Sequence, residues 1–89
     1  YGELWPASIG LARWIGRRLE LEGKRVLELG CGVAVAGVAA ALRGARVTLA
    51  DYFEEALAFA RHNAELNGAR DVRTLWLDWR DERFTESFD

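Results

Sequence analysis

Three short apolar runs alternate with segments of helical periodicity along this chain, and this alternation constrains the fold more than any other feature. The runs cover residues 25–29, 46–51 and 72–77 and are rich in aliphatic and β-branched side chains. Between them, residues 33–43 and 53–66 read as helices. Strands that alternate with helices pair in parallel through right-handed crossovers. The sequence therefore predicts an α/β fold.

A further helix is expected before the first strand. Leu11, Ile15 and Leu19 recur at helical spacing within residues 7–21, and Pro6 suits a first helical position because its missing N–H is harmless there. The last helix should bury an apolar stripe. That stripe consists of Phe53, Leu57, Ala60 and Ala64. The expected order is helix, then β-α-β-α-β.

The chain has 89 residues, so it holds one domain at most, and its 51% hydrophobic content is enough for a packed core. Three strands are few for a parallel sheet. If the first strand is central, as in doubly wound folds, it would leave an apolar edge exposed. We therefore expect residues 1–89 to form the N-terminal portion of a single, longer domain that is truncated at its C-terminus.

Net charge and cysteine content limit which partners and which cellular compartment are expected. The formal net charge of −2 argues against a nucleic-acid surface, which normally carries a basic excess. A single cysteine, Cys31, rules out an internal disulfide and fits a reducing compartment. The strongly apolar run 33–42 is too short to span a bilayer, and no signal peptide is evident. We expect a cytoplasmic protein without a membrane partner. With one histidine and one cysteine, no metal set is expected.

The segment V-L-E-L-G-C-G (26–32) is the strongest candidate for chemistry. Gly30 and Gly32 lie where a strand turns into a helix, so a ligand can approach the backbone, and the free N–H groups of the helix start favour a carboxylate or phosphate. The third glycine of a dinucleotide-binding pattern falls on Val35, so that pattern fails. Glu28 would repel a pyrophosphate but suits a cationic amino group. These features favour S-adenosylmethionine (SAM), which has an amino group, a carboxylate and a sulfonium but no phosphate.

Polar residues also end the second and third strands. Asp51 can accept hydrogen bonds from both hydroxyls of a ribose, and Asp78 can accept from an adenine amino group, with Trp79 stacked on the base. Each has a simpler reading, as a capping aspartate, a turn aspartate and a packing tryptophan. Since the carboxyl ends of parallel strands open into one crevice, we expect these residues to lie near Gly30.

These residues resemble class I SAM-dependent methyltransferases, with motif I at 26–32. The E-L-W-P-A-S segment at 3–8 and the L-D-W segment at 77–79 resemble more closely the seven-strand lysine methyltransferase-like and nicotinamide N-methyltransferase-like group. The resemblance covers nearly the whole chain. It implies a three-layer, Rossmann-like parallel sheet, of which this chain is the N-terminal, incomplete portion, and SAM as the cofactor.

The resemblance also implies a set of cofactor-binding residues. They are Glu28 and Gly30 near the methionine part, Gly32 for close backbone approach, Asp51 at the ribose, Tyr52 beside the adenine, Asp78 and Trp79 at the base, and Trp5 covering the site. Trp5 has an equally good reading as an anchor of the first helix. Two departures stand out, because Ala34 replaces the third loop glycine and Val33 replaces the usual Ser or Thr. Both are expected to loosen or reshape the site.

Three functions follow as hypotheses. The leading one is methyl transfer from SAM to a nucleophile, expected to be nitrogen, with the catalytic residues beyond Asp89. The alternatives are an NAD(P)-dependent oxidoreductase, against which Val35 and Glu28 count, and a non-catalytic binding module with a SAM-type fold. Protein lysine, a small amine and a nucleic-acid base all remain open as acceptors, and a protein or small molecule is favoured over nucleic acid.

Overall fold

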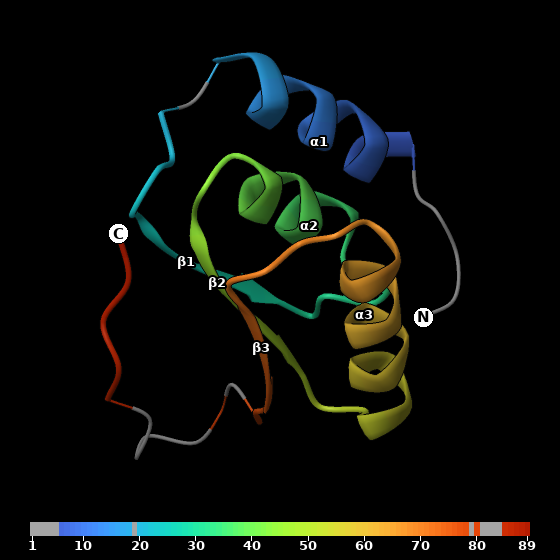
Figure 1. Cartoon of the computed structure of the whole chain (residues 1–89). Coiled ribbons are helices and arrows are strands. Elements are labelled where there is room, and N and C mark those ends of the chain that lie inside the picture. Colours follow the sequence, from blue (N-terminus) through green and yellow to red (C-terminus); the bar gives the residue numbers. More distant parts are fainter. Residues whose placement is uncertain (1–5, 19, 79, 81–84) are drawn as a thin grey trace.

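The computed structural model describes residues 6–18, 20–78, 80 and 85–89. Its helices are α1 (Pro6–Arg18), α2 (Val35–Leu42) and α3 (Glu54–Leu66), and its strands are β1 (Arg25–Leu29), β2 (Arg46–Asp51) and β3 (Val72–Trp76). Figure 1 shows them in this arrangement. The predicted order of elements is confirmed, and no bound differs from the expected one by more than three residues.

The three strands form one parallel sheet in the order β1-β2-β3. Leu29 pairs with Ala50, and Asp51 pairs with Trp76, so the carboxyl ends of all three strands lie at one edge. Beyond the end of β3, the N–H of Leu77 still donates to the carbonyl of Asp51 at 3.1 Å. The chain segments that follow the strands therefore leave the sheet side by side, as a doubly wound fold requires.

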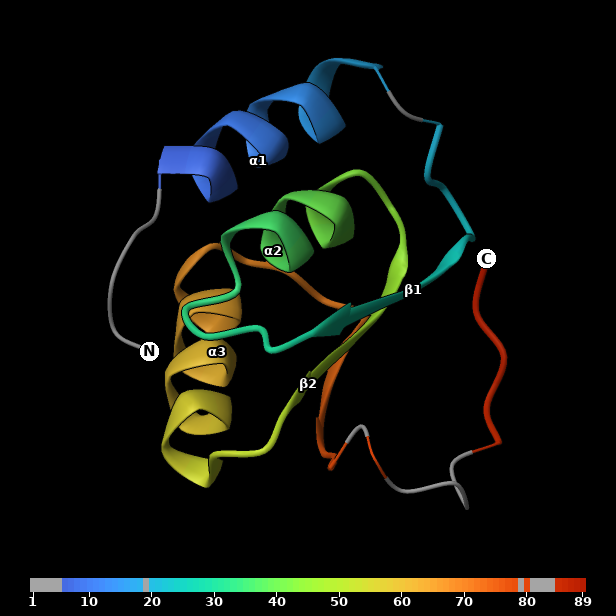
Figure 2. The ribbon, with the colours of Figure 1, turned by 180° about the vertical axis from the view of Figure 1, so that it is seen from behind.

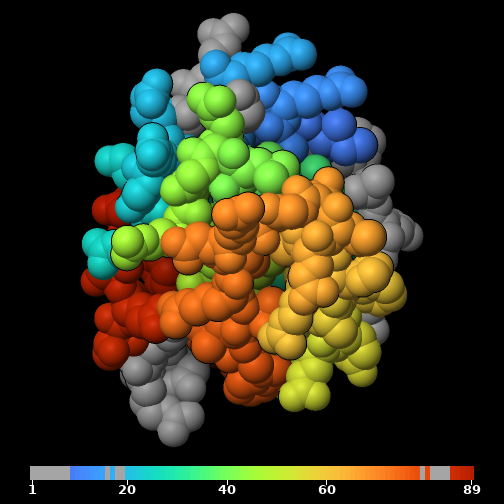
Figure 3. Space-filling view, viewed as in Figure 1, coloured from blue at the N-terminus to red at the C-terminus, as the bar shows by residue number. Residues whose placement is uncertain are grey.

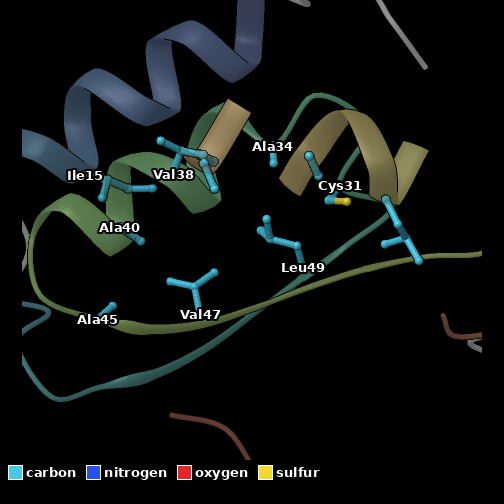
Figure 4. Close-up of a cluster of buried hydrophobic side chains, with 12 residues drawn as sticks. Ile15, Cys31, Ala34, Val38, Ala40, Ala45, Val47 and Leu49 are labelled. Carbon is cyan, nitrogen blue, oxygen red and sulfur yellow. The ribbon is translucent and has the colours of Figure 1, made fainter. Parts of the chain in front are cut away.

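Both crossover helices cover the same face of the sheet. Figures 1 and 2 show α2 and α3 over the strands, with α1 stacked on the outside of α2. Val47 and Leu49 of β2 point into the core from this face, and Leu49 is fully buried. Figure 4 shows part of the cluster around them, in which the labelled residues are Ile15, Cys31, Ala34, Val38, Ala40, Ala45, Val47 and Leu49. The small side chains of α2 allow this close packing.

The closest approach of α2 to the sheet is at Gly37. A Cβ atom at this position would lie 2.3 Å from Cδ2 of Leu49 and 2.8 Å from Oε1 of Glu28. Leu49 is fully buried, so a Cβ atom here would force Leu49 and Glu28 to shift within a packed core. Packing therefore favours glycine here, although the backbone of Gly37 is ordinary helix.

One expectation about buried residues is wrong. Phe53 was expected in the core stripe of α3 but is 53% exposed, because it is the extended N-cap residue and its side chain lies outside the helical stripe, which Ala56 completes instead. Leu11 is 49% exposed, since α1 packs on α2 rather than on the sheet and buries Ile15. Leu19 lies outside the described residues. The burial of Leu57, Ala60 and Ala64 is confirmed.

Residues 85–89 return to the beginning of the sheet. The N–H of Asp89 donates to the carbonyl of Arg25 at 2.8 Å, and the N–H of Arg25 donates to the Asp89 carboxylate at 2.8 Å. Arg73 pairs with Glu86, and Figure 3 shows this segment in red against β3 in orange. No strand is formed at Phe88 and Asp89, but the main-chain bond joins the outer edge of β1. Among the described residues, no helix is long and apolar enough to cross a membrane.

Candidate functional site

The turn between β1 and α2, residues 30–34, is called the glycine loop below. Its backbone passes three times through the left-handed region, at Gly30 (φ 61°), Gly32 (φ 52°) and Ala34 (φ 63°). Glycine adopts these angles freely, whereas a residue with a Cβ atom pays roughly 1–2 kcal/mol. Ala34, the predicted departure from the family pattern, therefore occupies a position where glycine would be unstrained. It is also the N-cap of α2, and no side chain caps that helix end.

Three hydrogen bonds attach the glycine loop to β2 and α3. The N–H of Cys31 donates to the carbonyl of Ala50 at 3.1 Å. The N–H of Gly32 donates to Oδ2 of Asp51 at 3.2 Å. The amide Nδ2 of Asn63, in α3, donates to the carbonyl of Val33 at 2.8 Å. Three consecutive loop residues are thus each held by a different partner.

Asp51 lies at the carboxyl end of β2 and is only 9% exposed. Its Oδ2 accepts the N–H of Gly32, and its Oδ1 accepts the N–H of Phe53 at 3.0 Å. A carboxylate offers about four acceptor positions. The two backbone donors fix the orientation of the Asp51 side chain.

Glu28 lies beneath the first turn of α2. Its Oε1 accepts the N–H of Gly37 at 3.1 Å. Burial raises the pKa of Glu28 from 4.5 to about 6, and the hydrogen bond from Gly37 opposes this shift. Since its carboxylate is engaged with α2, Glu28 acts within the protein as a link between β1 and α2. The contact with the methionine part of SAM stays a prediction.

Cys31 is buried between these two carboxylates. Burial, followed by the negative charges of Asp51 and Glu28, raises the pKa of its thiol to about 12. The thiol therefore stays protonated at neutral pH and is a poor nucleophile. Cys31 serves as a small buried residue of the turn.

Asp78 follows β3 at the same edge of the sheet. Its carboxylate accepts two bonds from the guanidinium of Arg80, at 2.9 and 2.8 Å, and one from the Arg80 N–H at 3.0 Å. The Arg80 side chain is exposed, and the pKa of its guanidinium is raised mainly by these bonds. Tyr52 and Trp76 lie side by side with ring centroids 5.5 Å apart, and both are half exposed. The edge thus carries an acidic and an aromatic surface next to each other.

The structure brings together five of the predicted site residues at the carboxyl edge of the sheet. They are Gly30, Gly32, Asp51, Tyr52 and Asp78. Glu28 lies below the loop, and Trp5 and Trp79 lie outside the described residues. His62 is exposed. In the described part of the chain, no group of three His, Cys, Asp or Glu residues is placed to hold a metal ion.

Two residues that shape this site were missed by the sequence reasoning. Gly37 seemed only to interrupt an apolar run, although glycine inside a helix is unfavourable and so indicates a packing constraint. Asn63 received no role. Asparagine is also unfavourable within a helix, because its side chain bonds to backbone groups elsewhere, and this was the available signal.

Comparison with known proteins relates the chain to methyltransferases. A family model described as lysine methyltransferase matches residues 2–89. The mouse histone-arginine methyltransferase METTL23 is 39% identical over 80 residues, which are 85% of this chain and 31% of the mouse protein. The ubiquinone biosynthesis O-methyltransferase of Pseudomonas aeruginosa is 42% identical over 77 residues, which are 85% of this chain and 33% of that protein. The chain spans about a third of the length of these relatives.

A solved structure gives the same relation in three dimensions. The crystal structure of the Pyrococcus abyssi tRNA (uracil-54, C5)-methyltransferase in complex with S-adenosyl-L-homocysteine (SAH) matches with a TM-score of 0.75 and 28% sequence identity. The match covers 100% of this chain and 22% of that chain. The three-stranded sheet and its helices thus have the Rossmann-like arrangement of methyltransferases.

Proposed function

The chain belongs to the lysine methyltransferase family, and on that premise we propose that it forms the SAM-binding part of a SAM-dependent methyltransferase. Its cofactor would lie across the carboxyl edge of the sheet, over the glycine loop. We also propose that residues 1–89 are part of one longer domain, because the chain spans about a third of its relatives and Asp89 already bonds to the outer edge of β1.

One observation carries this proposal: the buried carboxylate of Asp51 is held in place by the N–H groups of Gly32 and Phe53 at the edge where the glycine loop begins. Burial of a carboxylate is unfavourable unless it is hydrogen-bonded. The two donors meet that need and leave acceptor positions for two ribose hydroxyls. The glycine loop and a pre-oriented carboxylate together fit a nucleoside.

Gly30 supports the same placement. A Cβ atom built on Gly30 would meet nothing within 4 Å, so the space in front of this residue is open. Protein packing therefore does not require glycine at position 30. Its left-handed backbone favours glycine. The open space in front of it would admit a ligand.

The remaining site residues receive roles according to their neighbours. We assign the adenine to the surface of Tyr52 and Asp78, with Trp79 at the base and Trp5 over the site. Gly30 would face the methionine part of SAM. Glu28 would act on that part indirectly, because its carboxylate binds the backbone of α2 at Gly37. The guanidinium of Arg80 also binds the Asp78 carboxylate, so an adenine amino group would share that carboxylate with Arg80.

SAM supplies an activated methyl group on its sulfonium, which a nucleophile can displace directly to leave SAH. The task of this segment is then to bind and orient the cofactor. We propose a nitrogen acceptor on a protein, since the family model describes lysine methyltransferases and METTL23 acts on arginine in histones. The O-methyltransferase relative indicates that residues outside this segment select the acceptor. The free, buried Cys31 fits a cytoplasmic location, which we also propose.

Calorimetry on the complete protein tests the proposal. SAH should bind with one site per chain, and NADH at the same concentration should neither bind nor displace it. Binding of NADH in place of SAH would instead favour the oxidoreductase. Incubation with methyl-labelled SAM and a protein extract should then place label on protein nitrogen, and label on oxygen alone would contradict the acceptor assignment.

A further inference from the structure

Asn63 lies on α3, in the sequence far from the glycine loop, yet its side chain contacts that loop directly. Nδ2 donates to the carbonyl of Val33 at 2.8 Å, and Asn63 is partly buried. Its own carbonyl accepts the side-chain amide of Asn67, one turn further along α3, at 2.8 Å. Asn63 is thus the point where α3 is joined to the turn that precedes α2.

The glycine loop needs such attachments because its own conformation is costly to order. Three of its five residues are left-handed, and glycine loses more conformational freedom on folding than any other residue. Within the loop, the N–H of Ala34 bonds only to the carbonyl of Cys31, at 2.7 Å. The bonds to Ala50 and Asp51 hold the first half of the loop, and Asn63 holds the carbonyl of Val33 in the second half.

We infer that Asn63 is a positioning residue for the cofactor, which fixes the second half of the glycine loop in the shape that binds SAM. This inference rests on the proposed function. Asn63 itself touches no ligand in this account. It acts through the Val33 carbonyl, so that the backbone of Gly32 and Ala34 is already ordered when the cofactor arrives. A ligand that meets a pre-ordered loop does not bear the free-energy cost of ordering it.

Two neighbouring asparagines provide a matched experiment. Asn63→Asp keeps the shape of the side chain but replaces its NH₂ donor with an acceptor, and Asn63→Leu removes the donor without adding charge. Asn67→Asp makes the same chemical change one helical turn away, on an exposed side chain whose Nδ2 donates to the main-chain carbonyl of Asn63 and not to the Val33 carbonyl. Titration calorimetry of SAH into the complete protein gives both the dissociation constant and the number of binding sites for each variant.

We expect both Asn63 variants to bind SAH about five- to tenfold more weakly at an unchanged number of sites, which corresponds to the loss of one hydrogen bond. Asn67→Asp should match the parent. A purely structural role would instead reduce the number of sites at an unchanged dissociation constant, and this result overturns the inference. Equal weakening by Asn67→Asp also overturns it. If the parent itself does not bind SAH, the proposed function fails first.

Discussion

At the residue scale, Glu28 shows how a group that suggests ligand binding in the sequence can also have an internal task. It lies two residues before the first glycine, where a cationic ligand group would suit it. In the structure its carboxylate accepts the N–H of Gly37 and is largely buried. A buried carboxylate in this position links the end of β1 to the start of α2, and its charge has a cost that depends on pH.

This cost leads to a prediction. Because burial raises the pKa of Glu28 in the folded protein from 4.5 to about 6, the folded state binds a proton more tightly than the unfolded state. The stability that protonated Glu28 contributes to the folded state is complete below about pH 4.5 and is lost as the pH rises through 6. Relative to Glu28→Gln, which cannot titrate, the parent should lose roughly 1–2 kcal/mol of unfolding free energy between these limits. Urea unfolding at several pH values measures the difference, and a pH-independent difference would contradict it.

Gly30 gives a second prediction at this scale. Gly30→Ala introduces a methyl group into the open space in front of the loop, so SAH affinity should fall by more than about tenfold through a direct clash. The protein itself should lose about 1 kcal/mol of stability, owing to the positive φ. Calorimetry and urea unfolding measure the two effects.

Gly68→Ala is the control for that change. Gly68 has a similar φ of 70° and equally open surroundings, but it lies after α3 at the opposite end of the sheet from the site. The Gly68→Ala variant should lose about as much stability as Gly30→Ala and should bind SAH with the affinity of the parent. If Gly30→Ala also binds SAH normally, the cofactor does not pass in front of the glycine loop.

At the element scale, the packing of α2 on the sheet depends on one missing side chain. Gly37→Ala would place a Cβ atom against Leu49 and Glu28, which are held in the core and under the helix. We expect it to destabilise the protein by about 1–3 kcal/mol, even though alanine favours helices. Gly10→Ala in α1, where nothing lies within 4 Å, should instead stabilise by about 0.5–1 kcal/mol. Thermal or urea unfolding of both variants checks this contrast, and a stabilising Gly37→Ala would show that α2 can move away from the sheet.

The elements themselves could be predicted from the sequence, because periodicity and turn residues report local structure. Strand runs and helical stripes gave the order and approximate bounds of all six elements. The carboxyl-edge cluster could be predicted as well, since parallel strands end at a common edge. What could not be predicted depends on contacts between distant residues. The Gly37–Leu49 contact, the Asn63–Val33 bond and the exposure of Phe53 arise only when the helices take their places.

At the scale of the whole molecule, the two ends of the sheet differ in character. The carboxyl end carries the glycine loop, Asp51 and the aromatic pair of Tyr52 and Trp76. The amino end carries exposed ion pairs, such as Arg46 with Asp71 at 3.6 Å, with both side chains 69% exposed. Exposed pairs of this kind contribute little to stability. The proposed cofactor site therefore lies at the carboxyl end, whereas the ion pair of Arg46 and Asp71 lies at the amino end.

This contrast defines the most direct test of the account, which is the affinity of the complete protein for SAH in two aspartate variants. Asp51→Ala removes the carboxylate at the carboxyl edge, and Asp71→Ala removes one at the amino end. Calorimetry should show SAH binding to the parent and to Asp71→Ala alike, and binding weaker by about 10- to 100-fold in Asp51→Ala. Equal affinity in the parent and Asp51→Ala would contradict the proposed site.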